Sequence, residues 1–375
     1  ENEEEEEDKN EEESSSNTKS ENDENDTDSD NNNKNSKDDD DDDDEDESES
    51  SAVDDDSESD RYFSIFDFQQ LKAEPSLSID EPISLKLQGN LFVKKVPKKI
   101  VFGRGGLIIG ISSEFSLEIF KFPDFSRIKT RNFDTSLLSF TFSKDESQYF
   151  CCFFNKIIVF NLLDSTMNRA YCIEKCQKIV MHDTSTRFCT FHNDGRIKAF
   201  KLPQNIEIAS FNIEKSEVMV DATFSLDGRY IVVGFKSGKI SLFDIDQKKL
   251  IKTVNASKVQ INSMCFDSVN NYLFSAGDEK IFKKWRIDDD DLKYDMSFNC
   301  SGNVSAIGIK GKWLVSGSSD KTFSMTDIDN NKICYIVKSH SSPILCIAFA
   351  SYKEMFATAS KDMTVKIWTF QNSKK

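Results

Sequence analysis

Short runs of alternating apolar and polar residues, separated by tight polar turns, fill the chain from about residue 97 to residue 370. Residues 219–254 are typical, because they divide into the runs VDATF, YIVVGF, KISLF and LIKTV, with DG and KSG at two of the turns. Period-two alternation bounded by glycine-containing turns predicts β-hairpins. No stretch of this region has convincing helical periodicity over a dozen residues. We therefore predict an all-β fold.

The runs are organised in units of nearly constant length. One position, at the end of a short strand, recurs at intervals of 40, 40, 43, 42, 41 and 42 residues, and is occupied in turn by Phe120, Phe160, Phe200, Phe243, Trp285, Thr326 and Trp368. Units of about 40–45 residues with four strands each are typical of β-propellers. The spacing predicts a single seven-bladed β-propeller.

Ring closure requires a strand from the N-terminal side of the repeats. After Trp368 only TFQNSKK remains, which is too short to supply the outer strand of the last blade. We expect residues 83–87 (ISLKL) or residues 91–96 (LFVKKV) to supply it, because closure removes an open sheet edge. Residues 61–71 (RYFSIFDFQQL) are expected to pack on the rim or to dock onto a partner.

The units resemble the WD-repeat β-propeller family over roughly residues 97–370, and the last unit resembles it most. Its His340, Ser360, Asp362 and Trp368 stand where that family places a hydrogen-bonded structural tetrad, which ties a turn to a strand within a blade. The chain departs from the pattern, since one unit alone has the histidine and no unit reads Trp-Asp. The resemblance implies a non-catalytic scaffold with partners on the propeller faces.

Charge divides the chain into parts with different properties. Residues 1–60 contain 32 Asp or Glu and 4 Lys, which gives a net charge of −28, and they contain no aromatic residue. Such a segment cannot bury enough apolar surface to offset its ordering entropy, so we predict a disordered acidic tail. Residues 61–96 are assigned to an N-terminal extension that includes the closing strand, and residues 97–375 to the propeller. Five serines of the tail are candidate phosphorylation sites for an acid-directed kinase, or merely help to solubilise it: Ser29, Ser48, Ser50, Ser57 and Ser59.

Residues 61–375 carry a net charge of +10, although the whole chain carries −18. Three clusters give a candidate basic binding patch: Lys94, Lys95, Lys98, Lys99, Arg104, Arg127, Lys129, Arg131, Lys283, Lys284 and Arg286. These residues either protect exposed strand edges or offer a positive face to RNA, to an acidic protein or to a lipid surface. In the second case the acidic tail is able to compete for the same face.

The sequence contains no recognisable constellation for catalysis. His182 and His192 lie in turn-like contexts without a metal-ligating neighbour and are expected at the surface. The 9 cysteines include no C-x-x-C pair, and several lie in predicted strands, which favours free thiols in a reducing compartment. Gly103–Gly106 is interpreted as a tight turn, and Asp288–Asp291 as a solvated loop. We expect no catalytic, cofactor or metal site, and no membrane span, because the longest apolar stretch (149–160) is too short.

These observations favour a scaffold, monomeric within a larger complex. We expect a nuclear or nucleolar ribonucleoprotein assembly of the ribosome-building type, with protein partners on the faces and RNA at the basic residues. One alternative is a cytoplasmic adaptor or substrate receptor in ubiquitin transfer, trafficking or cilia. Another is an exchange factor of the trafficking kind, whose membrane anchor would be absent from this chain.

Overall fold

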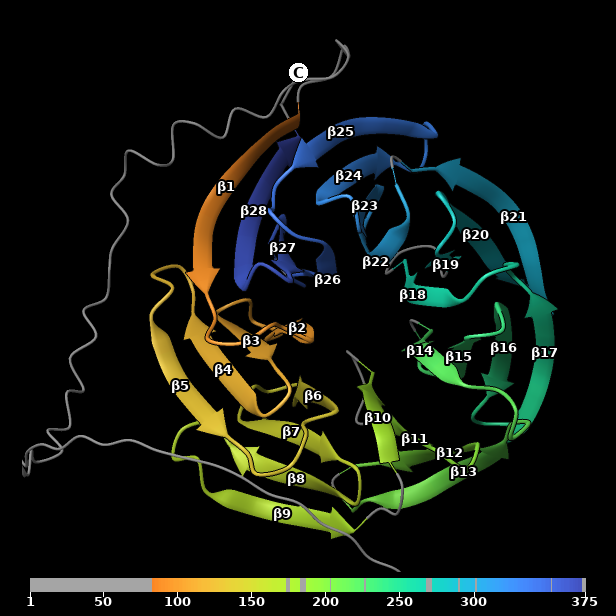
Figure 1. Ribbon diagram of the computed structural model, residues 1–375. Coiled ribbons are helices and arrows are strands. Elements are labelled where there is room, and N and C mark those ends of the chain that lie inside the picture. The colour runs from red at the N-terminus through yellow and green to blue at the C-terminus, as the bar shows by residue number, and fades with distance from the viewer. Residues whose placement is uncertain are drawn as a thin grey trace, which may run out of the picture. The chain divides into compact units, whose positions relative to one another are not determined.

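Seven four-stranded antiparallel sheets surround a central axis in the computed structural model (Figure 1). The structure describes residues 83–372, except 173–175, 183–186, 203, 226, 268–271, 289–290, 301 and 352. The prediction of an all-β, seven-bladed propeller is confirmed. The acidic tail, its five candidate phosphoserines and residues 61–71 lie outside the described residues.

Six blades are each built from four consecutive strands, which run from the axis outward. Their bounds, blade by blade, are β2 (Lys99–Phe102), β3 (Ile108–Ser112), β4 (Ser116–Lys121) and β5 (Arg127–Asn132); β6 (Ser139–Phe142), β7 (Gln148–Phe153), β8 (Lys156–Asn161) and β9 (Met167–Cys172); β10 (Cys176–Met181), β11 (Arg187–His192), β12 (Arg196–Lys201) and β13 (Ile206–Asn212); β14 (Met219–Phe224), β15 (Tyr230–Phe235), β16 (Lys239–Asp244) and β17 (Lys249–Asn255); β18 (Ile261–Phe266), β19 (Tyr272–Gly277), β20 (Ile281–Asp288) and β21 (Asp291–Asn299); and β22 (Val304–Lys310), β23 (Trp313–Ser318), β24 (Thr322–Asp327) and β25 (Lys332–Lys338). We number these blades 1 to 6 in chain order.

Blade 7 joins the two ends of the described chain. It contains β26 (Ile344–Phe349), β27 (Met355–Ser360) and β28 (Thr364–Asn372), and its outer strand is β1 (Ile83–Phe92). The first of the two expected closing segments, residues 83–87, lies within β1, whereas only Leu91 and Phe92 of the second do. Because β1 pairs antiparallel with β28, the outer edge of blade 7 is made by a strand from the other end of the repeats.

The hydrophobic core lies between neighbouring blades. One cluster joins Phe191 and Phe211 of blade 3 to Phe224 and Phe243 of blade 4. The recurring large residue contributes to such clusters, and Trp368 at this position is buried beside Phe323 of blade 6. Flat aromatic rings fill the wedge between two twisted sheets, which accounts for much of the content of 31 phenylalanines.

Polar contacts also join the innermost strands of neighbouring blades. The Lys99 ammonium of blade 1 donates to the Ser139 hydroxyl of blade 2 (3.0 Å), and that hydroxyl lies 3.3 Å from the Ile179 carbonyl of blade 3. Lys178 of blade 3 forms an ion pair with Asp221 of blade 4. These links cross the junctions between blades 1 and 2, 2 and 3, and 3 and 4.

The remaining junctions are crossed in the same way. Asp221 accepts a hydrogen bond from the backbone N–H of Met264 in blade 5 (2.7 Å). Between blades 5 and 6, the Ile307 N–H donates to the Ser263 hydroxyl (3.2 Å). Between blades 6 and 7, the Ser305 hydroxyl donates to the Ile344 carbonyl (2.5 Å). Between blades 7 and 1, the Cys346 thiol donates to the Lys98 carbonyl (2.9 Å). We call these seven links the junction ring, since together they connect every pair of adjacent blades.

Closure by β1 predicts unequal effects for two adjacent residues of that strand. Leu91 is 5% exposed and packs against blades 7 and 1, whereas Phe92 is 57% exposed. We expect Leu91→Ala to lower the free energy of unfolding by about 2–4 kcal/mol. The matched variant Phe92→Ala is expected to lower it by less than about 1 kcal/mol. Urea unfolding followed by tryptophan fluorescence measures both, and equal losses would contradict the register of β1.

Candidate functional site

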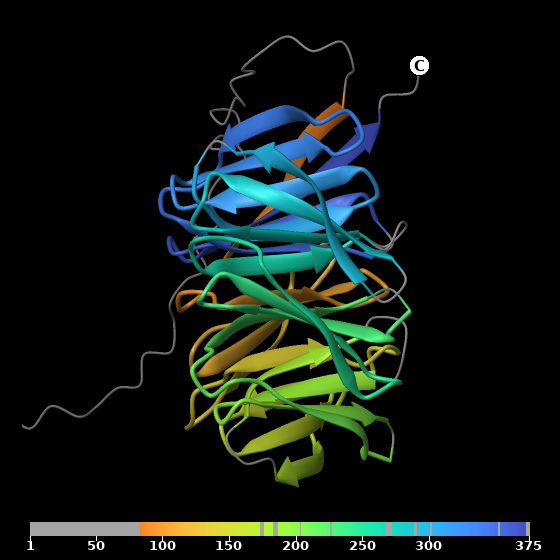
Figure 2. The same ribbon diagram turned by 90° about the vertical axis from the view of Figure 1, so that its right-hand side faces the viewer.

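The propeller presents two faces, because its strands run between two sets of loops (Figure 2). We call the face where each innermost strand begins the entry face. It carries the loops 93–98, 113–115, 133–138, 154–155 and 361–363, among others. The opposite face, where each innermost strand ends, is the exit face, and it carries the turns 103–107 and 143–147. Gly103–Gly106 forms a tight turn here, as expected, with Gly106 at a φ of 65°.

The predicted basic patch is not one surface. Lys94 to Lys99 lie on or just before β2, and Arg104 lies in the turn that follows this strand. Arg127, Lys129 and Arg131 lie on β5, the outer strand of blade 1. Lys283, Lys284 and Arg286 lie on β20 in blade 5, on another side of the ring (Figure 1). The structure therefore separates the third cluster from the first two.

The β5 cluster links blade 1 to blade 2. Lys129 donates to the Leu162 carbonyl (2.7 Å), and Arg131 donates to the Ser165 carbonyl (2.6 Å) and lies over the Phe160 ring. Loss of solvent lowers the pKa of Lys129, and the nearby Arg131 charge lowers it further. These side chains join the rims of two blades.

Arg127 has a different partner within its own blade. Its guanidinium forms an ion pair with the buried Glu118 carboxylate (2.9 Å) and lies over the Phe120 ring. A buried carboxylate needs such a partner, since an unpaired buried charge is strongly unfavourable. The Arg127 guanidinium thus neutralises the buried Glu118 carboxylate.

The β20 cluster is also paired within the protein. Lys284 and Arg286 form ion pairs with Asp295 (3.2 Å) and Asp288 (2.9 Å), and Lys283 lies 3.7 Å from Glu279. Asp288 is the last residue of β20 and Asp291 is the first residue of β21, where its carboxylate forms an ion pair with Lys252 (2.5 Å). Burial, and after it the nearby Lys178 charge, lowers the pKa of Lys99 to about 8. The candidate basic residues of β5 and β20 thus interact mainly with other residues of the propeller.

Exposed apolar side chains gather on the entry face around blade 1. Phe115, Leu138, Phe154 and Met363 are each more than a third exposed although they are large and apolar. Exposed lysines lie in or beside the same loops: Lys94, Lys95, Lys98, Lys156 and Lys361. We call these nine residues the lysine–aromatic surface. Apolar side chains that are exposed together, rather than singly, mark interaction sites.

Hydrogen bonds between the loops hold this surface together. The Val93 N–H donates to the Met363 carbonyl (3.0 Å), and the Phe133 N–H donates to the Phe115 carbonyl (2.8 Å). Ser113 donates to the Lys95 carbonyl (3.2 Å), and the Lys95 ammonium lies over the Phe115 ring. Hydrogen bonds thus link the turn before β28 in blade 7 with the loops of blade 1 and with the connection from blade 1 to blade 2.

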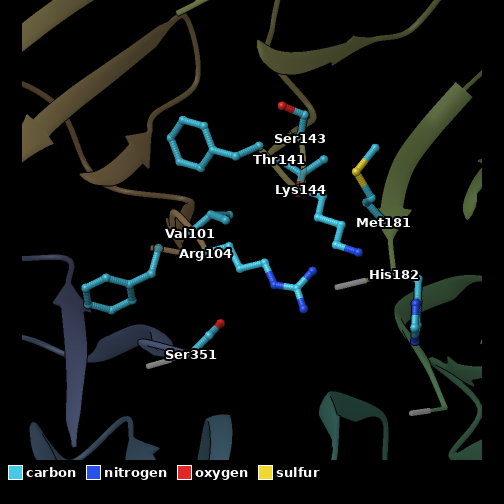
Figure 3. A pocket seen from close by; sticks show the side chains of 10 residues that line it. Val101, Arg104, Thr141, Ser143, Lys144, Met181, His182 and Ser351 are labelled. Carbon is cyan, nitrogen blue, oxygen red and sulfur yellow. The ribbon is translucent and has the colours of Figure 1, made fainter. Parts of the chain in front are cut away.

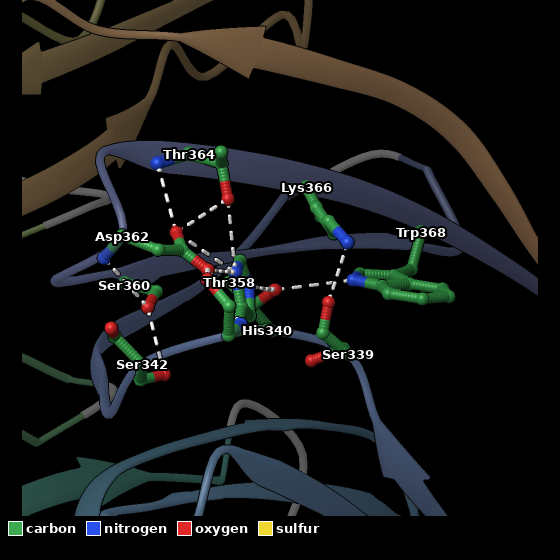
Figure 4. Close-up of polar contacts among 10 residues, drawn as sticks. Ser339, His340, Ser342, Thr358, Ser360, Asp362, Thr364, Lys366 and Trp368 are labelled. Atoms are coloured by element: carbon green, nitrogen blue, oxygen red, sulfur yellow. Dashed lines mark hydrogen bonds and ion pairs between the residues drawn. The ribbon is translucent and has the colours of Figure 1, made fainter. Parts of the chain in front are cut away.

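A second polar arrangement lies within blade 7 (Figure 4). His340 Nδ1 lies 3.1 Å from the Asp362 carboxylate, and its Nε2 lies 2.8 Å from the Thr358 hydroxyl. The Trp368 indole N–H donates to this hydroxyl (3.2 Å). A neutral imidazole that donates from Nδ1 and accepts at Nε2 satisfies every one of these contacts. The network ties the loop before β26 to the turn before β28.

Thr358, and not Ser360, is the member between His340 and Trp368. The expected place of Ser360 in the tetrad was wrong, because its hydroxyl donates to the Ser342 carbonyl (2.9 Å) and accepts from the Asp362 N–H (3.1 Å). The spacing from Thr358 to Trp368 is 10 residues, as it is for the hydrogen-bonded pair of Ser275 and Trp285. Aligning these two units would have identified Thr358 from the sequence.

The other two histidines are buried, so their expected surface location was wrong. His182 packs its ring edge-on against Phe224. His192 Nε2 lies 3.0 Å from the Thr190 hydroxyl in β11. His182 directly follows β10 and His192 is the last residue of β11, both in blade 3.

The described part of the chain lacks the features of three other kinds of site. It contains no group of three or more His, Cys, Asp or Glu residues that could hold a metal ion. Its cysteines are free thiols, with Cys152 and Cys176 in contact between blades 2 and 3. None of its elements is a helix long and apolar enough to cross a bilayer.

Comparison with known proteins agrees with this architecture. The family model "WD domain, G-beta repeat" matches residues 331–369, and the model "Anaphase-promoting complex subunit 4 WD40 domain" matches residues 190–269. The β-propeller domain of Myceliophteria thermophila Cps50 (Swd1) superimposes with a TM-score of 0.66 at 10% identity, over 76% of this chain and 99% of that one. The chain belongs to the WD40-repeat β-propeller family. Propellers of this family are typically non-catalytic scaffolds for protein interaction.

Several curated WD40 proteins are similar to parts of the chain. Autophagy-related protein 16 of Arabidopsis thaliana is 25% identical over 39% of this chain and 30% of its own length. The DDB1- and CUL4-associated factor 11 homolog of Caenorhabditis briggsae is 32% identical over 28% of this chain and 20% of its own. Pre-mRNA-processing factor 19 of Dictyostelium discoideum is 24% identical over 56% of this chain and 42% of its own. The chain thus spans less than half the length of each of these relatives.

The environment of His340 predicts a loss of stability in mild acid. Burial lowers its pKa to about 4, against the opposing effect of Asp362. The unfolded chain, whose histidine titrates near 6.5, therefore binds the proton first, and stability is lost as the pH falls from about 6.5 towards about 4.

We expect the stability advantage of the wild type over His340→Gln to shrink by up to about 3 kcal/mol across this pH window. Urea unfolding at several pH values measures the difference, in which the contributions of the other two histidines cancel. A difference that does not change with pH would contradict a neutral imidazole in the folded state.

Proposed function

We propose that the chain is a scaffold that docks an acidic, partly apolar segment of a partner protein on the lysine–aromatic surface. The observation that carries the proposal is the grouping of Phe115, Leu138, Phe154 and Met363 among five exposed lysines on adjoining loops. Burial of such side chains supplies affinity, and the lysines favour a negatively charged partner.

A protein partner fits this surface better than RNA does. Leu138 and Met363 offer flexible aliphatic groups, which pack well against protein side chains but give no flat platform for bases. The basic residues expected to contact RNA on β5 and β20 are paired within the fold instead. Any RNA in the assembly is then held chiefly by the partners.

The assembly itself is proposed to be a nuclear ribonucleoprotein complex. The support is the similarity to Pre-mRNA-processing factor 19 over 56% of the chain. A second candidate is a substrate receptor in ubiquitin transfer. It is favoured by the similarity to the DDB1- and CUL4-associated factor 11 homolog, which reaches 32% identity over a shorter stretch.

Two substitutions on the lysine–aromatic surface test the docking proposal. Phe115→Ser with Phe154→Ser removes two exposed aromatic rings without opening the core. We expect the full-length double variant to lose its co-purifying proteins by at least about tenfold in quantitative mass spectrometry. Leu163→Ser is the matched control, because Leu163 is 96% exposed but lies in the turn after β8 on the exit face.

Retention of the same proteins by the double variant would contradict the docking proposal. Ribonuclease treatment of the wild-type sample separates the two candidate assemblies. A ribonucleoprotein complex contains RNA and loses some proteins on digestion, whereas a ubiquitin-transfer complex is unaffected and contains ligase subunits.

For the purified full chain we expect few phosphate contacts with RNA. The slope of the logarithm of the binding constant against the logarithm of the salt concentration should then be shallower than about −2.

A further inference from the structure

Two buried cysteines lie in contact at the junction between blades 2 and 3. The Sγ atoms of Cys152 in β7 and Cys176 in β10 are 3.2 Å apart. Both side chains are buried among apolar residues of the two blades, including Phe150, Ile157 and Phe188. The two cysteines are 24 positions apart in the sequence, so the fold, and not the local chain, brings their thiols together.

Backbone hydrogen bonds connect the same two cysteines to the lysine–aromatic surface. The Leu138 N–H donates to the Cys152 carbonyl (2.9 Å), and the Cys176 N–H donates to the Phe154 carbonyl (2.7 Å). Leu138 and Phe154 are two of the four exposed apolar members of that surface. One backbone hydrogen bond thus connects each cysteine with an apolar residue of the lysine–aromatic surface.

The two thiols differ in their chemistry. The hydrogen bond between them lowers the pKa of Cys176 and raises the pKa of Cys152. Because the thiolate is the reactive form of a cysteine, Cys176 is the better nucleophile of the pair. Cys151, the sequence neighbour of Cys152, packs in the cluster between blades 1 and 2 instead.

We propose that Cys152 and Cys176 are a redox-active dithiol, which a peroxide converts to a disulfide that joins blades 2 and 3 next to the lysine–aromatic surface. The contact of 3.2 Å leaves about 1.2 Å to the length of a disulfide bond. Hydrogen peroxide is small and uncharged, and local opening of the fold admits it to buried thiols. This chemistry does not depend on the identity of any docked partner.

Two steps convert the dithiol to the disulfide. In the first, the Cys176 thiolate attacks one oxygen of hydrogen peroxide, the O–O bond breaks, and the hydroxide that leaves takes up the proton lost by Cys176. In the second, Cys152 Sγ attacks the sulfur of the Cys176 sulfenic acid, so that the S–S bond forms and the S–O bond breaks. The departing hydroxide takes the Cys152 thiol proton. The dithiol is thereby oxidised by two electrons, and one peroxide is reduced to two molecules of water.

Met181, at the other end of β10, is a second sulfur that peroxide oxidises. Its half-buried side chain lines a small pocket on the exit face (Figure 3). Oxidation of a methionine adds one oxygen, whereas formation of a disulfide removes two hydrogens. Mass spectrometry therefore separates the two products, and Met181 serves as an internal measure of unselective oxidation.

Treatment of the reduced full chain with stoichiometric hydrogen peroxide, followed by thiol blocking and trypsin digestion, tests the proposal. Trypsin places Cys152 in the peptide 145–156 and Cys176 in the peptide 176–178. We expect these two peptides to be linked at a peroxide dose that leaves Met181 unmodified, and dithiothreitol to reverse the link. The peptide 145–156 also contains Cys151, so Cys151→Ala is the matched control and should keep the link.

Hydrogen–deuterium exchange shows whether the bond affects the lysine–aromatic surface. In the oxidised wild type we expect the amides of Leu138 and Cys176 to exchange about tenfold more slowly than in the reduced chain, because the cross-link opposes local opening. In Cys152→Ala, peroxide should leave the exchange of both amides unchanged.

Three results would overturn the proposal. One is a link from the peptide 145–156 to the peptide 170–175, which would make Cys172 the partner. Another is a sulfoxide at Met181 that forms before any link between the cysteines. The third is an exchange rate at Leu138 that oxidation of the wild type does not change.

Discussion

The junction ring is the constraint on which the propeller depends, because each blade contributes little stability unless it is held against its neighbours. Hydrophobic packing between sheets is not directional, and it does not by itself fix the angle between two blades. Hydrogen bonds and one ion pair between the innermost strands fix that angle at each of the seven junctions. Pairing of β1 with β28 then closes the ring at its outer edge.

This arrangement explains how a propeller of positive net charge uses its cations. Lys99 and Lys178 hold innermost strands together, and Lys129 and Arg131 hold the rims of blades 1 and 2. Exposed lysines of the loops contribute to the lysine–aromatic surface on the entry face. A rigid ring that presents such a surface is suited to hold a partner in a fixed orientation.

Much of the fold could be predicted from the sequence, because a repeat of about 40 residues and period-two alternation are local properties that every unit repeats. The sites were harder to predict. Exposure of Phe115 and Phe154 depends on which loops the ring brings together, although both residues lie at turns (SSEFS and FFNK), where a large apolar residue is unusual. The role of Thr358 could be found by aligning its unit with that of Ser275 and Trp285. The pairing of Lys129 and Arg131 could not, because it depends on contacts between blades.

If charged side chains hold the blades together, the most direct measurement is a double-mutant cycle on Lys178 and Asp221 in urea unfolding. Asp221→Leu alone should cost about 3–5 kcal/mol, because it leaves Lys178 without its partner and the Met264 N–H without its acceptor. The double variant Lys178→Met/Asp221→Leu should lose less free energy of unfolding than the two single variants lose together, by about 1.5–3 kcal/mol. If the loss in the double variant equals the sum of the two single losses to within about 0.5 kcal/mol, the two charges do not couple, and this result would contradict the account.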